Sequence, residues 1–115
     1  MWHERNWRMR VEDILVCIDK IKTYTLNMTF EQFSSDDKTV DAVIRNFEII
    51  GEAASHIPLE IQDQYPHLAW LEMRGMRNII AHEYFGVSLS IIWHTAEYDL
   101  PKLEKELRTL LENQN

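Results

Sequence analysis

Five polar side chains that suit phosphate chemistry stand close together in the sequence. They are Arg74, Arg77, Asn78, His82 and Tyr84. An arginine can bind phosphate oxygens through two parallel hydrogen bonds and stabilise negative charge that develops there. A histidine with a pKa near ~6.5 can accept or donate a proton at neutral pH. RNA carries its own nucleophile, the 2′-hydroxyl, so an arginine and a histidine at one phosphate could cleave RNA without a metal ion.

Spacing alone does not bring Arg77 and His82 to one substrate atom. At about 100° per helical residue, His82 is rotated by roughly 140° from Arg77, whereas Tyr84 lies nearly above Arg77. The pair could meet if the helix loosens near Gly86, or if a second copy supplies the complement across a twofold axis. On spacing alone, a solvated arginine and a buried, hydrogen-bonded histidine are the commoner arrangement.

The histidines do not form a metal-binding pattern. His82 begins a segment like a zinc-protease motif, but Gly86 stands where the second histidine belongs. Di-iron bundles need a glutamate three residues before an inward-facing histidine. That position is occupied by Ala53, Gln64, Ile79 and Ile91 before His56, His67, His82 and His94. We therefore expect no metal and no other cofactor.

The elements that must position these residues are predicted to be helices. Apolar residues make up 45% of the sequence, while glycine and proline occur only three times each, which favours helices. Apolar spacing predicts a single all-α domain over residues 1–115, an antiparallel bundle of four to five helices. The expected helices cover about 4–25, 35–57, 58–64, 70–84 and 88–111, with a loop at 27–37 that Phe30 and Phe33 attach to the core. Ser35 or Asp36 and Ser88 or Ser90 are the expected caps, and Pro101 should bend or split the last helix.

The Gly51-Glu52 step allows two interpretations. In one, the glycine permits close helix packing and Glu52 pairs with a neighbouring arginine such as Arg45 or Arg74. In the other, Glu52 orients Arg77 or lines the cleft.

Charge restricts the function. The net charge of −7 argues against unspecific binding to nucleic acid. A nuclease would need a local basic surface made by Arg74, Arg77 and Arg45, with Arg74 as an auxiliary phosphate contact. Such local focusing predicts a modest, salt-sensitive affinity.

The sequence also predicts a cellular compartment. The N-terminal residues have scattered charges and no apolar core, so we expect no signal peptide. No apolar run approaches the ~18 residues of a membrane span. Cys17 is the single cysteine, which excludes an intramolecular disulfide, and its apolar neighbours predict a buried, inert thiol. We expect a cytoplasmic protein without membrane contact.

Residues 75–84, with the sequence GMRNIIAHEY, resemble the signature of HepT-like toxins, a branch of the HEPN superfamily. That signature is an arginine, a polar residue, three further residues, a histidine, one residue and a tyrosine. The resemblance extends from about residue 10 to 105 and matches the motif throughout. It includes 41–54, Tyr65-Pro66, Trp70, Trp93 and 100–103.

The resemblance implies an all-helical HEPN-like fold and a metal-independent endoribonuclease with a composite site across a homodimer. Arg77 and His82 match the catalytic pair, and Asn78 matches the polar residue that shapes the site. Arg77 would bind the scissile phosphate, while His82 takes the 2′-hydroxyl proton or protonates the leaving oxygen, giving a 2′,3′-cyclic phosphate. Tyr84 matches the tyrosine that a partner nucleotidyltransferase antitoxin modifies with AMP, as in a type VII-like toxin–antitoxin system.

Two alternatives remain beside the ribonuclease toxin. The first is a catalytically weak helical module that docks a nucleotidyltransferase and offers Tyr84 as its acceptor. The second is a purely structural helical adaptor.

Overall fold

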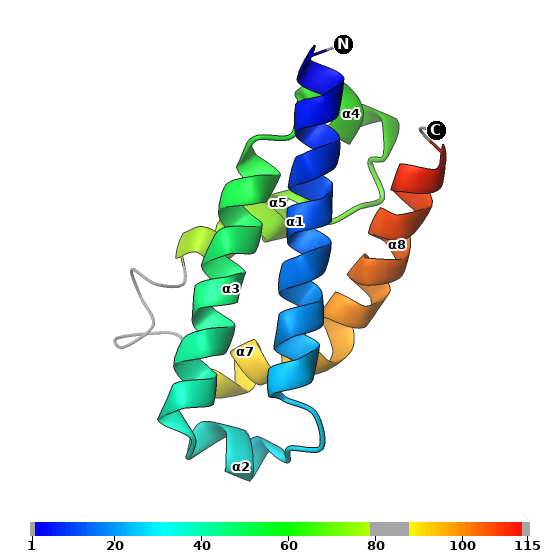
Figure 1. Ribbon diagram of the computed structural model, residues 1–115. Helices are drawn as coiled ribbons and strands as arrows, with labels where there is room; N and C mark the ends of the chain where they lie inside the picture. Colours follow the sequence, from blue (N-terminus) through cyan, green and yellow to red (C-terminus); the bar gives the residue numbers. More distant parts are fainter. Residues whose placement is uncertain (1, 79–87, 114–115) are drawn as a thin grey trace.

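Two long antiparallel helices, α1 (Trp2–Tyr24) and α3 (Asp37–Ser55), lie side by side at the centre of the structure. A third long helix, α8 (Leu100–Asn113), packs against the other side of α1 (Figure 1). The computed structural model describes residues 2–78 and 88–113. Every regular element in these ranges is helical, which confirms the predicted all-α fold.

Apolar side chains at helical spacing explain why these segments form helices. Residues three or four apart share one face of a helix, and burying that face stabilises it. The buried positions include Val11, Ile14, Ile18 and Ile21 in α1, Val43, Phe47, Ile50 and Ala54 in α3, and Leu103, Leu107 and Leu110 in α8. Cys17 is buried as predicted, and burial raises the pKa of its thiol.

The segment between α1 and α3 contains a helix where the sequence analysis expects a loop. The short helix α2 (Phe30–Ser34) begins at a capping box. Thr29 Oγ1 accepts from the Gln32 amide, and Gln32 Oε1 accepts from the Thr29 amide. These two bonds satisfy amide groups that a short helix otherwise leaves free. Phe33 is buried beside the Trp93 ring, so the expected attachment of this segment to the core is confirmed.

Helix α3 has the predicted start and end. The Asp36 side chain accepts from the Thr39 amide and caps the helix. The helix ends at Ser55, ahead of Pro58, because a residue before proline avoids helical geometry. The short helix α4 (Leu59–Gln64) follows, with Pro58 just before its first helical residue.

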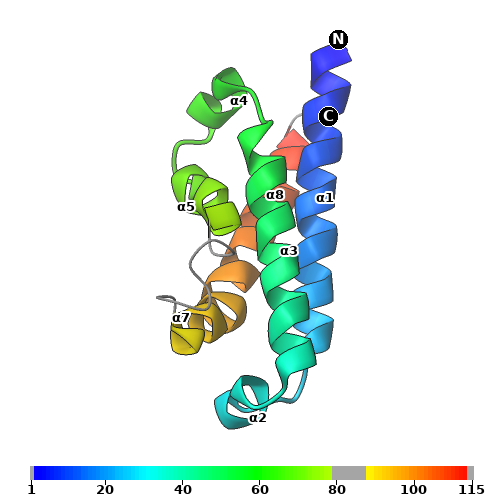
Figure 2. The ribbon, with the colours of Figure 1, turned by 90° about the vertical axis from the view of Figure 1, so that its left-hand side faces the viewer.

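The helix expected over residues 70–84 is α-helical only as far as Gly75 in the structure. Helix α5 (Trp70–Gly75) continues as a 3₁₀ turn, η1 (Met76–Asn78). Both pack against α3, on the side away from α1 (Figure 2). Residues 79–87 lie outside the described residues, so the structure leaves untested the expected helix end near Tyr84 and Gly86.

Pro101 interrupts the last helix, as predicted. Helix α7 (Leu89–His94), capped by Ser88, runs into a π-helical turn, η2 (Thr95–Asp99), and then into α8. In the π turn, the Leu100 amide donates to the Thr95 carbonyl five residues earlier. Proline has no N–H to donate to the carbonyl four residues before it, so the wider turn accommodates this gap.

Among the described helices, none combines the length and the apolar character required to cross a membrane.

Candidate functional site

The backbone of Arg77 lies directly on helix α3. Gly51 is buried there, and a Cβ atom at this position would stand 2.4 Å from Arg77 N and 2.9 Å from Arg77 Cβ. It would also stand 3.1 Å from the carbonyl oxygen of Arg74. Real Cβ atoms do not approach backbone nitrogen this closely, so only glycine fits. The interpretation of Gly51 as a residue that permits close packing is confirmed.

The side chain of Arg77 extends along the outer surface of α3 to Glu52. Arg77 Nη1 lies 3.4 Å from Glu52 Oε1, and the two side chains are 48% and 56% exposed. Within residues 2–78 and 88–113, Glu52 is the one ion-pair partner of Arg77. A guanidinium has five N–H donors, so most of the donors of Arg77 remain available to a ligand.

Glu52 also binds His56, one helical turn further along α3. His56 Nε2 donates to Glu52 Oε2 at 2.9 Å, so the two carboxylate oxygens serve different partners. The hydrogen bond from His56, and after it that from Arg77, lowers the pKa of Glu52. Glu52 is therefore ionised at neutral pH. The result is a surface chain of three side chains in which a carboxylate joins an imidazole to a guanidinium.

The interpretation in which Glu52 pairs with Arg45 or Arg74 is wrong. Arg45 forms its ion pair with Glu48, which lies one turn before Glu52 on α3. Arg74 Nη1 donates to Gln62 Oε1 at 2.6 Å, so its guanidinium is held by α4. Arg74 and Arg77 thus bind different helices, and the role of Arg74 as an auxiliary phosphate contact stays a prediction.

Of three further predicted site residues, the structure describes one, Asn78. Asn78 is exposed and is the last residue of η1. His82 and Tyr84 lie outside the described residues. The described residues therefore do not test whether the histidine of the motif reaches the phosphate that Arg77 would bind.

His56 is the site residue that sequence reasoning missed. The sequence analysis considers it only as a metal ligand and sets it aside for want of a glutamate three residues earlier. Glu52 precedes it by four residues, and residues four apart face each other on a helix. That spacing was the available signal for the Glu52–His56 contact.

A polar hollow of about 350 Å³ borders this site between α1 and α3. It is lined by Arg10, Asp13, Arg45, Glu48, Ile49, Glu52 and Ala53. Two arginines thus line the hollow, as a locally basic surface requires, but three carboxylates line it with them. The hollow does not remove the objection that the negative net charge raises against RNA binding.

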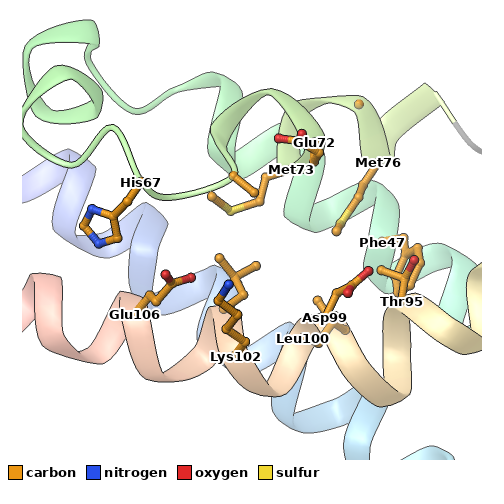
Figure 3. Close-up of a pocket in the computed structure, with 13 residues that line it drawn as sticks. Phe47, His67, Glu72, Met73, Met76, Thr95, Asp99, Leu100, Lys102 and Glu106 are labelled. Carbon is orange, nitrogen blue, oxygen red and sulfur yellow. The ribbon is translucent and has the colours of Figure 1, made fainter.

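A separate cavity of about 530 Å³ lies between α5 and the η2–α8 segment (Figure 3). Its floor is apolar and includes Phe47, Met73 and Leu100, and its rim carries Glu72, Asp99, Lys102 and Glu106. Carboxylates outnumber the lysine, and such a rim repels phosphate. Arg77 does not line this cavity; it belongs to η1, and its side chain lies at the surface beside α3.

Comparison with known proteins shows the family to which this chain belongs. The family model described as "Ribonuclease HepT-like" matches residues 14–110. "Putative RNase MJ1216" of Methanocaldococcus jannaschii is 37% identical over 110 residues, which cover 96% of this chain and 91% of the relative. "Probable ribonuclease HepT" of Thermococcus cleftensis is 39% identical over 107 residues, covering 93% of this chain and 97% of the relative. No solved structure matches the chain. With a family match over most of its length and an arginine of the motif presented at the surface of α3, the chain belongs to the HepT-like ribonucleases of the HEPN superfamily.

Proposed function

We propose that this ribonuclease is a metal-independent endoribonuclease toxin whose composite site forms across a homodimer. The observation that carries the proposal is the placement of Arg77. Its backbone is fixed against Gly51, while its guanidinium lies at the surface and contacts one exposed carboxylate. An arginine whose backbone is held in place and whose guanidinium has free N–H donors is suited to bind a phosphate from solution.

Arg77 from each protomer binds the scissile phosphate and stabilises the negative charge that increases in the transition state. His82 takes the proton of the 2′-hydroxyl or protonates the leaving oxygen. The 2′ oxygen attacks phosphorus, the bond to the 5′ oxygen breaks, and the products are a 2′,3′-cyclic phosphate and a 5′-hydroxyl. Arg77 and His82 of one protomer would face different directions around a helix, so the second protomer supplies the complementary residue.

Tyr84 is the proposed point of control. A nucleotidyltransferase antitoxin would transfer AMP to its hydroxyl and thereby place a phosphate near Arg77. That phosphate would occupy the guanidinium and repel RNA by its charge. This would make the chain the toxin of a type VII-like toxin–antitoxin pair that acts in the cytoplasm.

The negative charge of the chain favours a second candidate function. A dimer would carry −14, twice the −7 of one chain, and would repel RNA at long range. In this alternative, the protein is a weakly active module that docks a nucleotidyltransferase and serves as its substrate. His82→Ala would then change little, while Tyr84→Phe would remove the modification.

The deciding experiment measures RNA cleavage in EDTA by protein produced without any antitoxin. Wild type is compared with Arg77→Ala and His82→Ala. His67→Ala is the control, because His67 is exposed and lines the cavity that Arg77 does not line. We expect cyclic-phosphate ends from wild type and His67→Ala, and loss of cleavage in the other two. Absence of cleavage of any cellular RNA by a folded, unmodified dimer would contradict the ribonuclease toxin.

A further inference from the structure

We propose that Gly51 and Glu52 form a platform that positions Arg77, with Glu52 as a positioning residue that holds the guanidinium while a substrate phosphate binds its other donors. This inference rests on the proposed ribonuclease function. Two independent contacts carry it, one to the backbone of Arg77 and one to its side chain.

The backbone contact fixes the position of the Arg77 main chain. Gly51 leaves the space in which Arg77 N and Cβ lie, at 2.4 Å and 2.9 Å from where a Cβ would stand. The 3₁₀ turn that carries Arg77 is therefore pressed against α3 and cannot move inward. The base of the side chain is set by packing, which is rigid.

The side-chain contact fixes where Arg77 ends. Glu52 follows Gly51 on α3, and its Oε1 atom faces Arg77 Nη1 at 3.4 Å. The other oxygen, Oε2, is held by His56 at 2.9 Å. Because His56 occupies one oxygen, the carboxylate is oriented so that the second oxygen meets Arg77. His56 thus acts on Arg77 through Glu52.

The exposure of the pair leaves room for a phosphate beside Glu52. An ion pair between exposed side chains is weak, because water screens it and both side chains lose freedom. Glu52 faces Nη1 of Arg77, and a guanidinium has five N–H donors, so two of the others can form parallel hydrogen bonds with a phosphate. Glu52 therefore still holds the guanidinium when the phosphate is bound.

This arrangement predicts opposite effects on binding and on catalysis. Removing the charge of Glu52 removes a carboxylate that repels RNA, so KM should fall. The guanidinium also loses its orientation, so kcat should fall, since small displacements of a catalytic group cost much rate. A residue that only supports folding would not lower both constants.

The kinetic test compares Glu52→Gln with Glu48→Gln. Glu48 lies one turn earlier on α3 and pairs with Arg45, so its variant removes the same charge without touching Arg77. We expect kcat to fall about tenfold in Glu52→Gln and to stay at the wild-type level in Glu48→Gln, with KM lowered in Glu52→Gln. His56→Ala should lower kcat by a smaller factor. An unchanged kcat in Glu52→Gln, or an equal loss in Glu48→Gln, would overturn the proposal.

A second test does not depend on cleavage. The Nε–H signal of Arg77 in the NMR spectrum of the full chain is assigned with Arg77→Lys and followed in each variant. Glu52→Gln should shift this signal and Glu48→Gln should not, and inorganic phosphate should shift it at lower concentration in Glu52→Gln. If wild type cleaves no RNA but the signal responds as described, the ribonuclease proposal fails and the platform stands. If Arg77→Ala abolishes cleavage but the signal ignores Glu52→Gln, the platform alone fails.

Discussion

Arg74 and Arg77 are three residues apart, yet their guanidinium groups are held by different helices. Arg74 donates to Gln62 on α4 at 2.6 Å, and Arg77 faces Glu52 on α3 at 3.4 Å. The first contact is partly buried and the second is exposed. The structure therefore divides the two arginines between a stabilising position and a position open to ligands.

This division predicts different consequences for the two alanine variants. Arg74→Ala should lower the free energy of unfolding by about 1–2 kcal/mol, because a partly buried hydrogen bond from a charged group is lost. Arg77→Ala should change the free energy of unfolding by less than about 0.5 kcal/mol, as exposed substitutions do, while it abolishes RNA cleavage. Urea denaturation and the cleavage assay measure both quantities. Equal stability of the two variants would contradict the division.

The contact between Gly51 and Arg77 predicts a second pair of outcomes. Gly51→Ala places a methyl group against the Arg77 backbone and should lower the free energy of unfolding by about 1–3 kcal/mol, as overpacking does. Cleavage should fall at least about tenfold, because the turn that carries Arg77 must shift.

Gly75→Ala is the matched control for this experiment. A Cβ at Gly75 meets nothing within 4 Å, and alanine is the better helix former by about 0.5–1 kcal/mol. Thermal unfolding and cleavage should therefore stay at or slightly above wild-type values. If the two alanine variants behaved alike, the close approach at Gly51 would have no functional meaning.

Local sequence signals account for most of what could be predicted of the fold. Asp36 and Ser88 cap their helices as expected, and Pro101 interrupts the last one, because each effect depends on neighbouring residues alone. Helix α2 was missed although Thr29 and Gln32 have the spacing of a capping box. The polar composition of that segment is typical of a loop, so the capping box was not recognised as a helix start.

Contacts between distant segments account for what could not be predicted of the site. Arg77 was identified from its motif, but its approach to Gly51 joins residues that are far apart in the sequence. The same holds for Glu52, which by charge alone could pair with any of three arginines. In the structure Arg74 binds Gln62 on α4 and Arg45 pairs with Glu48. Glu52 therefore pairs with Arg77, a choice that depends on how the helices pack and not on sequence spacing.

The ion pairs of Glu104 predict how stability depends on pH. Glu104 accepts from Lys22 and from Arg108, each at 3.0 Å, and thereby connects α8 to α1. The bond from Lys22, followed by that from Arg108, lowers the pKa of Glu104 below its ordinary value of 4.5. A carboxyl group with a lowered pKa in the folded state stabilises the protein above the ordinary pKa, and this contribution is lost as pH falls below it.

Glu104→Gln should therefore lower the free energy of unfolding by roughly 0.5–1 kcal/mol at pH 7. The difference from wild type should shrink as pH falls below 4.5. Urea denaturation of both proteins between about pH 3 and pH 7, roughly the range in which carboxyl groups titrate, measures this difference. Cleavage at neutral pH should not change, because Glu104 lies away from Arg77. A stability difference that persists at low pH would show that the effect comes from packing and not from charge.

Tyr84 tests whether the ribonuclease is controlled through its own motif. Tyr84→Phe keeps the aromatic ring but removes the hydroxyl that would accept AMP, so the variant should still cleave RNA and should escape silencing by a nucleotidyltransferase. Intact-mass measurement after co-expression should show added AMP on wild type and none on the variant. The modified wild type should also lose the response of the Arg77 NMR signal to inorganic phosphate, since its own phosphate occupies that guanidinium. Silencing of Tyr84→Phe to the same extent as wild type would place the control elsewhere in the molecule.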